Sequence, residues 1–239
     1  MKNLDVGKVI RWGLAIIALG LVVAVFVWNA VSDDKDIDFT VWNEEMTMGS
    51  KEAENHFIEY TDAMCPYCTF FTLALHENEA DFKQNYLDNN KVYFELRLAD
   101  ILVDKNDNSH RANTASYCAA EGGNFWGFYV ALQDYLNETY WQYVDWSKVK
   151  QSNEKSDMEI IDDQIYLDIA SNYAGLDSDE MLDCMDNSKD VQAKLASATT
   201  KAGGIVTGVP YFVFNDYRSS GFGGDYTTIK QMFKAGGAY

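Results

Sequence analysis

Cys65 and Cys68 stand one helical turn apart in Cys65-Pro66-Tyr67-Cys68, a spacing suited to thiol–disulfide exchange. An apolar segment at 56–61 precedes them and is typical of a buried strand, and a glycine-free segment from Pro66 to about Tyr86 predicts a helix. Proline is tolerated in the first turn of a helix, so we expect Cys65 at the N-terminus, where free N–H groups and the dipole favour a thiolate. Cys65 is therefore the expected attacking sulfur, exposed and reactive. Cys68 is expected to be shielded and close enough to form a disulfide with it.

A zinc site is the main alternative, because a C-x-x-C pair can be half of one. The remaining cysteines, Cys118 and Cys184, are isolated and form no second pair. The histidines do not supply the missing ligands either, since no two of them have a metal-ligand spacing: His56, His76 and His110. The sequence therefore predicts redox chemistry with no bound metal and no cofactor.

The N-terminal segment has the composition of a membrane-spanning helix. Residues 13–28 are an unbroken apolar run, which extends loosely from Val9 to Val31. Basic residues precede the run and acidic residues follow it, which predicts a cytoplasmic N-terminus and an extracytoplasmic remainder. A cleaved secretory signal is the alternative, but Trp28 is bulky where a cleavage site needs a small residue. We therefore expect an uncleaved anchor over residues 1–31, and a single-pass protein of the cell membrane.

The charge of the chain is strongly acidic. The 239 residues carry a formal charge of −18, and residues 33–239 hold 16 basic and 36 acidic side chains, which gives −20. Such a surface argues against nucleic acid as a partner. An extracytoplasmic location permits stable disulfides, so we expect a structural disulfide between Cys118 and Cys184, each on a predicted helix. Two buried free thiols are the alternative.

The periodicity beyond the motif indicates an α/β protein with a helical insertion. A strand at 91–98 follows the first helix, and strand–helix–strand over this distance predicts a right-handed crossover between parallel strands. From residue 108 to about 204 the pattern is helical throughout. Strand character returns at Tyr211–Phe214, and a last helix is expected at about 227–234. An alternating segment at 36–42 is expected to form an edge strand.

Several motifs together resemble the DsbA-like family of thiol–disulfide oxidoreductases, whose thioredoxin-like fold contains an inserted all-helical domain. The motifs are Phe57-Ile58-Glu59-Tyr60 ahead of Cys65-Pro66-Tyr67-Cys68, the run from Cys118 to Trp126, and Gly208-Val209-Pro210 before a strand. The resemblance implies a thioredoxin-like domain at 55–107 and 203–239 and a helical insertion domain at 108–202. Residues 32–54 would link this fold to the anchor.

The resemblance also implies roles for individual residues. Cys65 corresponds to the nucleophile of the family, Cys68 to its resolving cysteine and Pro210 to its cis-proline. A cis-proline cannot donate an N–H group, and it leaves the backbone of Val209 free to pair with an extended substrate peptide. The peptide would then lie beside the Pro66-Tyr67 dipeptide.

Glu59 corresponds to a buried acid of the family. A carboxylate in a central strand that helices cover on both faces is costly to bury. The resemblance implies that Glu59 relays a proton to or from Cys68 as the disulfide opens and closes. An acid at a strand end that reaches water is the alternative.

The function implied is extracytoplasmic thiol–disulfide exchange, with the Cys65–Cys68 disulfide donated to secreted or cell-surface proteins that have free cysteines. A membrane quinone-coupled protein, DsbB-like or VKOR-like, would reoxidise the pair. The best-known oxidases of the family have Pro-His between the cysteines, and the neutral Tyr67 adds no positive charge there, so we expect a milder oxidant. A reductase or isomerase, and a metal- or peptide-binding module, are the alternatives.

Overall fold

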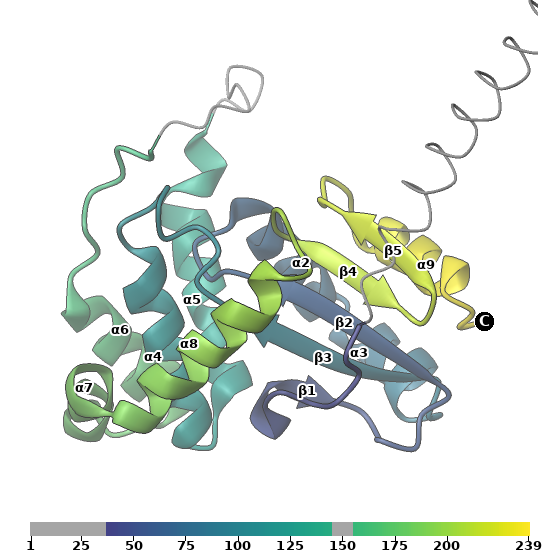
Figure 1. Cartoon of the computed structure of the whole chain (residues 1–239), viewed down its shortest axis with the longest axis horizontal. Coiled ribbons are helices and arrows are strands. Elements are labelled where there is room, and N and C mark those ends of the chain that lie inside the picture. Colours follow the sequence, from purple (N-terminus) through teal and green to yellow (C-terminus); the bar gives the residue numbers. More distant parts are fainter. Residues whose placement is uncertain (1–36, 145–154) are drawn as a thin grey trace, which may run out of the picture. The chain divides into compact units, whose positions relative to one another are not determined.

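A five-stranded sheet organises the part of the chain that the computed structural model describes, residues 37–144 and 155–239 (Figure 1). The strand order is β1-β3-β2-β4-β5, and the bounds are β1 (Thr47–Met48), β2 (Asn55–Thr61), β3 (Val92–Leu98), β4 (Tyr211–Phe214) and β5 (Tyr217–Ser220). No helix in these two ranges is long and apolar enough to cross a bilayer. The anchor predicted at 1–31 lies outside them.

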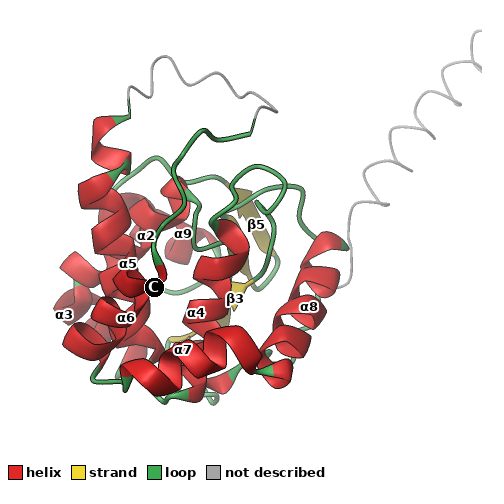
Figure 2. Cartoon of the chain, turned by 90° about the vertical axis from the view of Figure 1, so that its left-hand side faces the viewer, coloured by secondary structure: helices red, strands yellow, loops and turns green. Residues whose placement is uncertain are grey.

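Helices make up most of the remaining chain. They are α2 (Pro66–Glu77), α3 (Glu79–Phe82), α4 (Ser109–Glu121), α5 (Phe125–Thr139), α6 (Asp163–Ile169), α7 (Ser178–Asn187), α8 (Lys189–Gly203) and α9 (Tyr226–Ala235). Figure 1 shows α4 to α8 gathered on one side of the strands, and Figure 2, viewed from that side, shows α4, α7 and α8 in front of the sheet. The predicted helical insertion is therefore a separate layer of helices between β3 and β4.

The predicted crossover is confirmed. Strand β2 pairs in parallel with β3, with Phe57 opposite Phe94, and α2 and α3 connect the two strands. Strand β4 pairs antiparallel on the other side of β2, so β2 is a central strand. The cysteine motif therefore follows the strand that is enclosed by partners on both edges.

An aromatic core lies between the sheet and the helices α2 and α9. The ring of Phe57, which is fully buried, has its centroid within 6.0 Å of five other phenylalanine rings: Phe71, Phe94, Phe212, Phe214 and Phe233. Burying rings of this size supplies much of the hydrophobic stabilisation of a domain. The start of α2, and with it the cysteine motif, is fixed against this core.

The structure joins Cys118 of α4 to Cys184 of α7 in a disulfide, with a Cα–Cα distance of 5.8 Å. The bond connects two helices of the insertion that lie in contact. Cys65 and Cys68 are both free thiols. The four cysteines thus divide into a structural pair and a pair available for chemistry.

The prediction of an edge strand at 36–42 is wrong. Residues 37–42 form no strand, and the edge position belongs to β1, which pairs antiparallel with β3. The segment is held instead by side chains of β3: Glu95 accepts a hydrogen bond from the backbone N–H of Trp42 at 2.9 Å, and Arg97 donates one to the carbonyl of Thr40 at 3.1 Å. The buried Glu95–Arg97 ion pair therefore holds this segment, in place of the backbone hydrogen bonds that a strand would make.

Two predicted helices have different bounds. The helix expected from Pro66 to about Tyr86 ends at Glu77, where Asn78 leaves helical geometry, and α3 and a π-helical turn at Lys83–Leu87 follow. In the segment expected to be helical throughout, from residue 108 to about 204, residues 155–162 form no helix. The helix α6 begins at Asp163, because the side chain of Asp162 caps it by accepting from the N–H of Gln164. Neither change moves the cysteine motif.

Candidate active site

Cys65 caps the N-terminus of α2. Its backbone is extended (φ −89°, ψ 114°), its Sγ accepts a hydrogen bond from the N–H of Cys68 at 3.3 Å, and Pro66 is the first helical residue. A sulfur that accepts from a helix N-terminus is stabilised as a thiolate, because free N–H groups and the helix dipole both face it. The sequence predicts this placement, and the structure has it.

Cys65 is more enclosed than expected. Its exposed fraction is 2%, against 0% for Cys68, so the prediction of an exposed nucleophile is wrong. The cover comes from a distant loop, since the Cys65 Sγ lies 3.5 Å from the carbonyl oxygen of Val209. The exposed residue of the motif is Tyr67, at 40%. A thiol that approaches Cys65 must therefore reach it beside Tyr67 and the Val209 loop.

The Val209 loop is brought to the motif by the start of β4. The peptide bond between Val209 and Pro210 is cis, and Pro210 is buried while Val209 is half-buried. The loop and the cysteine motif are 144 residues apart in the chain but meet at the Cys65 sulfur. The residues that the sequence predicts for substrate binding, Val209 and the Pro66-Tyr67 dipeptide, therefore border one site.

Cys68 is fully buried, beside Cys65, Glu59 and the hydroxyl of Thr61. Burial raises the pKa of the Cys68 thiol well above its usual value, and the neighbouring Cys65 sulfur and the Glu59 carboxyl act in the same direction. The reduced form therefore keeps the Cys68 proton, whereas the helix N-terminus points at Cys65. This asymmetry favours the predicted roles, with Cys65 as the attacking sulfur and Cys68 as the resolving one.

Glu59 lies fully buried in the middle of β2, opposite Leu96 on one neighbouring strand and Phe212 on the other. Neither carboxyl oxygen has a hydrogen-bond partner among the described residues. Burial, with a smaller contribution from Cys65, raises the pKa of Glu59 well above the usual value for a carboxyl group. Glu59 therefore does not reach water at a strand end, and it can hold a proton beside the two thiols.

Asp62 is a site residue that the sequence analysis did not identify. It directly follows β2 and is fully buried. Its carboxylate accepts four hydrogen bonds, from the N–H groups of Met64 (3.0 Å), Ile101 (3.0 Å) and Leu102 (2.9 Å) and from the hydroxyl of Ser109 (2.6 Å). These donors come from the motif loop and from the connection between β3 and α4. Asp62 thus fixes the approach to Cys65, and its place directly after the strand was the available signal.

Polar side chains of the helical insertion hold the same loop. Asn113 of α4 accepts from the N–H of Ala63 at 2.9 Å, and Gln133 of α5 donates to the Ala63 carbonyl at 3.3 Å. Gln133 also accepts from the hydroxyl of Thr69 at 2.5 Å. Asn113 and Gln133 are fully buried. In the sequence, the available signal for both was an amide residue on a helix face that is otherwise apolar.

In the ranges that the structure covers, no cluster of three or more His, Cys, Asp or Glu residues is arranged to hold a metal ion. The histidines are used elsewhere. His56 Nε2 lies 2.9 Å from the Glu95 carboxylate, and His110 Nδ1 lies 2.7 Å from that of Asp100. The donor set near the two thiols consists of Cys65, Cys68 and the buried Glu59, which is a set for proton and disulfide chemistry.

Comparisons with known proteins identify the family and the fold. The family model described as Thioredoxin matches residues 42–227. No curated protein matches the sequence. Similar solved structures include oxidised BdbD from Bacillus subtilis (18% identity, TM-score 0.59, 80% of this chain and 91% of that one) and DsbA from Chlamydia trachomatis (14%, 0.55, 84% and 95%). A thioredoxin-like oxidoreductase from Silicibacter pomeroyi is 21% identical, with a TM-score of 0.54 over 79% of this chain and 90% of that one.

Proposed function

The chain belongs to the thioredoxin family and has the fold of DsbA-like thiol–disulfide oxidoreductases, and we propose that it is a dithiol oxidase of proteins outside the cytoplasm. The observation that carries the proposal is the position of the Cys65 sulfur. It lies at the start of α2, where it accepts from the Cys68 N–H, and it faces the backbone of Val209. A nucleophile and leaving group of this kind, next to the backbone of Val209, can form a mixed disulfide with a peptide that lies along the loop.

The reaction proceeds from the oxidised Cys65–Cys68 form. A substrate thiolate attacks Cys65 Sγ, the Cys65–Cys68 bond breaks, and the Cys68 sulfur leaves and takes up a proton. A second thiolate of the substrate then attacks the substrate sulfur of the mixed disulfide. The two substrate sulfurs become joined, and Cys65 leaves as a thiolate. The substrate loses two electrons and the enzyme gains them. In the first step Glu59 is the proton donor for Cys68, because it is buried beside the thiols and holds its proton.

The helix N-terminus at Cys65 favours oxidation of the substrate over its reduction. Stabilising the Cys65 thiolate stabilises the reduced enzyme, and a stabilised reduced form makes the disulfide a better oxidant. The DsbA-like helical layer and the apolar N-terminal segment support a role at the outer face of the cell membrane, where a quinone-coupled DsbB-like or VKOR-like protein would reoxidise the pair.

The equilibrium of the Cys65–Cys68 pair with glutathione tests the proposal. We expect a reduction potential between about −270 mV, the value of thioredoxin, and about −120 mV, that of DsbA. The Cys118→Ala/Cys184→Ala variant provides the matched control, because it leaves only the reactive pair to titrate. A potential at or below that of thioredoxin would refute the oxidase and leave a reductase.

Tyr67 favours the reductase as the second candidate, because the neutral phenol adds no positive charge beside Cys65. We expect the Tyr67→His variant to be more oxidising than the parent, by about 30 mV for each tenfold change in the equilibrium constant. Tyr67→Phe is the control and should leave the potential unchanged. A binding module without redox activity is a third candidate, and it would keep its activity when Cys65 and Cys68 are both serine.

The membrane attachment has its own test. If residues 1–31 are retained as an anchor, the protein resists extraction with alkaline carbonate and begins at its encoded N-terminus. A protein that is extracted and begins near Val31 would instead have lost a signal peptide.

A further inference from the structure

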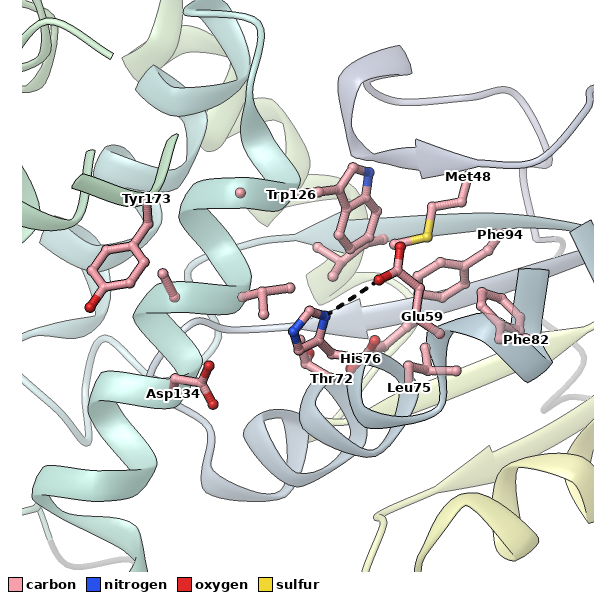
Figure 3. A pocket seen from close by; sticks show the side chains of 15 residues that line it. Met48, Glu59, Thr72, Leu75, His76, Phe82, Phe94, Trp126, Asp134 and Tyr173 are labelled. Atoms are coloured by element: carbon pink, nitrogen blue, oxygen red, sulfur yellow. Dashed lines mark ion pairs between the residues drawn. The ribbon is translucent and has the colours of Figure 1, made fainter. Parts of the chain in front are cut away.

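A cavity of about 350 Å³ lies between the sheet and the helices α2, α3 and α5, and Glu59 forms part of its wall (Figure 3). Its wall is mainly apolar and aromatic, with Leu75, Phe82, Phe94, Leu96, Trp126 and Val130. The volume falls within the range of small-molecule sites, roughly 300–1,000 Å³. The substrate exchange described above uses the Cys65 side, the Val209 loop and, of the cavity wall, Glu59 as a proton donor. It assigns no ligand to the cavity itself.

The polar groups of the cavity wall include three carboxyl groups. Glu59 lines the cavity, is fully buried, and has no hydrogen-bond partner at either oxygen within the described ranges. A buried carboxyl without a partner costs free energy, and a ligand donor that pairs with it removes that cost. Glu59 is therefore the group that a ligand in this cavity would satisfy.

Two further carboxyl groups lie at the wall. Figure 3 shows Asp134 and Tyr173 on the side of the cavity opposite Met48 and Phe94. Asp134 of α5 is exposed and makes no hydrogen bond or ion pair within the part of the chain described. Glu79 of α3 is shared between Lys83 and His76, whose Nδ1 lies 4.0 Å from it. The Asp134 carboxylate is thus the acidic group of the wall that has no cationic partner in the described ranges, and the Glu59 carboxyl can accept a hydrogen bond from a cationic donor. The cavity therefore favours a cation over an anion.

We propose that this cavity binds a small primary amine with an apolar, preferably aromatic, body, whose ammonium group pairs with Glu59. Aromatic faces add to the attraction, since the rings of Trp126, Phe82 and Phe94 carry negative charge on their faces and stabilise a nearby cation. The body of the ligand replaces water against these apolar walls. The site is separate from the Cys65 sulfur, and its occupation does not require thiol exchange.

Isothermal titration calorimetry of the full-length, oxidised protein with 2-phenylethylamine and with 2-phenylethanol tests the proposal. The two probes have nearly the same shape and differ in charge. We expect the amine to bind roughly tenfold more tightly than the alcohol, as for the gain of one charge-assisted hydrogen bond. Equal affinities for the two probes, or no binding of the amine, would overturn the proposal.

Variants then assign the interaction. Glu59→Gln should bring the affinity for the amine down to that for the alcohol and leave the alcohol unchanged, while Asp216→Asn, at an exposed aspartate outside the cavity wall, should change neither. Amine binding that survives Glu59→Gln would refute the pairing. Because Glu59→Gln changes a buried group, its fold is checked by thermal unfolding in parallel.

Filling the cavity gives a test that leaves Glu59 intact. Ala131 of α5 is half-buried and lines the cavity, so Ala131→Phe should exclude both probes. The indole N–H of Trp126, which donates to the carbonyl of Thr47 at 3.1 Å, reports the site directly by NMR. Its resonance should shift on addition of amine to the parent and not to Ala131→Phe. Amine binding that persists in the filled variant would place the site elsewhere and overturn the proposal.

Discussion

At the scale of single residues, the two reactive thiols differ in what faces their sulfur atoms. Cys65 Sγ accepts from the N–H of Cys68 at the start of α2, whereas Cys68 is fully buried beside Glu59 and Thr61. Exposure does not separate them, since both are almost fully buried. The separation comes from the orientation of one helix terminus and from the desolvation of the other sulfur.

Alkylation of the reduced protein should therefore modify Cys65 first. We expect Cys65 to react at least about tenfold faster than Cys68 between pH 6 and pH 8, because the reactive species is the thiolate. Peptide mass spectrometry after brief exposure to iodoacetamide measures the two rates, and the disulfide-bonded Cys118 and Cys184 are the internal control. Faster modification of Cys68 would contradict the assigned roles.

The buried Glu59 should make stability depend on pH. Its folded-state pKa is raised, so its contribution to stability is fully present below the unfolded-state pKa of about 4.3 and is lost as the pH rises towards the folded-state pKa. Glu59→Gln removes this loss. We expect the oxidised variant to gain on the order of 1–3 kcal/mol over the parent at pH 8, and almost nothing at pH 4.

Urea unfolding of both oxidised proteins at pH 4, 6 and 8 measures this difference. The exposed Glu54→Gln is the matched control and should show no such trend. A gain of the same size at all three pH values would mean that packing, not proton binding, causes it.

At the scale of elements, the motif loop, which begins at Asp62, is held by three segments that are distant in the chain. Asp62 connects it to the segment between β3 and α4, and Asn113 and Gln133 connect it to α4 and α5. These contacts are polar, buried and directional. The helical layer therefore positions the cysteines through hydrogen bonds to the backbone N–H and carbonyl groups of Ala63.

Asp62→Asn should be strongly destabilising although it keeps the size of the side chain. The Oδ2 atom accepts from two backbone N–H groups, and an amide nitrogen in its place would face both donors without accepting. We expect a loss on the order of 2–4 kcal/mol in urea unfolding, with slower disulfide exchange. Asp104→Asn, on the exposed face of the same connection, should stay within about 0.5 kcal/mol of the parent. A near-neutral Asp62→Asn would show that the hydrogen bonds contribute little.

At the scale of the whole molecule, one covalent bond constrains the helical insertion. The Cys118–Cys184 disulfide joins α4 to α7 across 66 residues of chain, and the ring that it closes includes α5 and α6. Arg111 of α4 adds ion pairs to Asp163 at 2.6 Å and to Asp186, just beyond Cys184, at 2.8 Å. The insertion is thereby fixed as the support for Asn113 and Gln133.

Removal of this disulfide should lower the stability of the molecule while leaving the reactive pair intact. For Cys118→Ala/Cys184→Ala we expect a loss of about 4 kcal/mol from the loop-closure entropy of the unfolded chain. Thermal and urea unfolding of the variant measure it, and the glutathione equilibrium of Cys65–Cys68 should not change. A shift in that equilibrium would show that the disulfide also tunes the reactive site.

The sequence by itself determined the features that depend on neighbours within one or two turns. The C-x-x-C spacing, Pro66 at the first helical position and the apolar strand before it predict a capping Cys65, because capping and the helix dipole act locally. The parallel pair of β2 and β3 follows from strand–helix–strand order. The alternation at 36–42 was a misleading local signal, since the side chains of Glu95 and Arg97 hold that segment instead.

The tertiary structure alone decided what surrounds the reactive sulfur. The Val209 carbonyl covers Cys65 from a loop 144 residues away. The β3–α4 connection, which donates to Asp62, and the side chains of Asn113 and Gln133 meet the motif loop from separate elements. The cavity beside Glu59 likewise forms only where the sheet, α2, α3 and α5 pack together. Burial and hydrogen-bond partners depend on contacts between distant segments, and no local pattern specifies which segments those are.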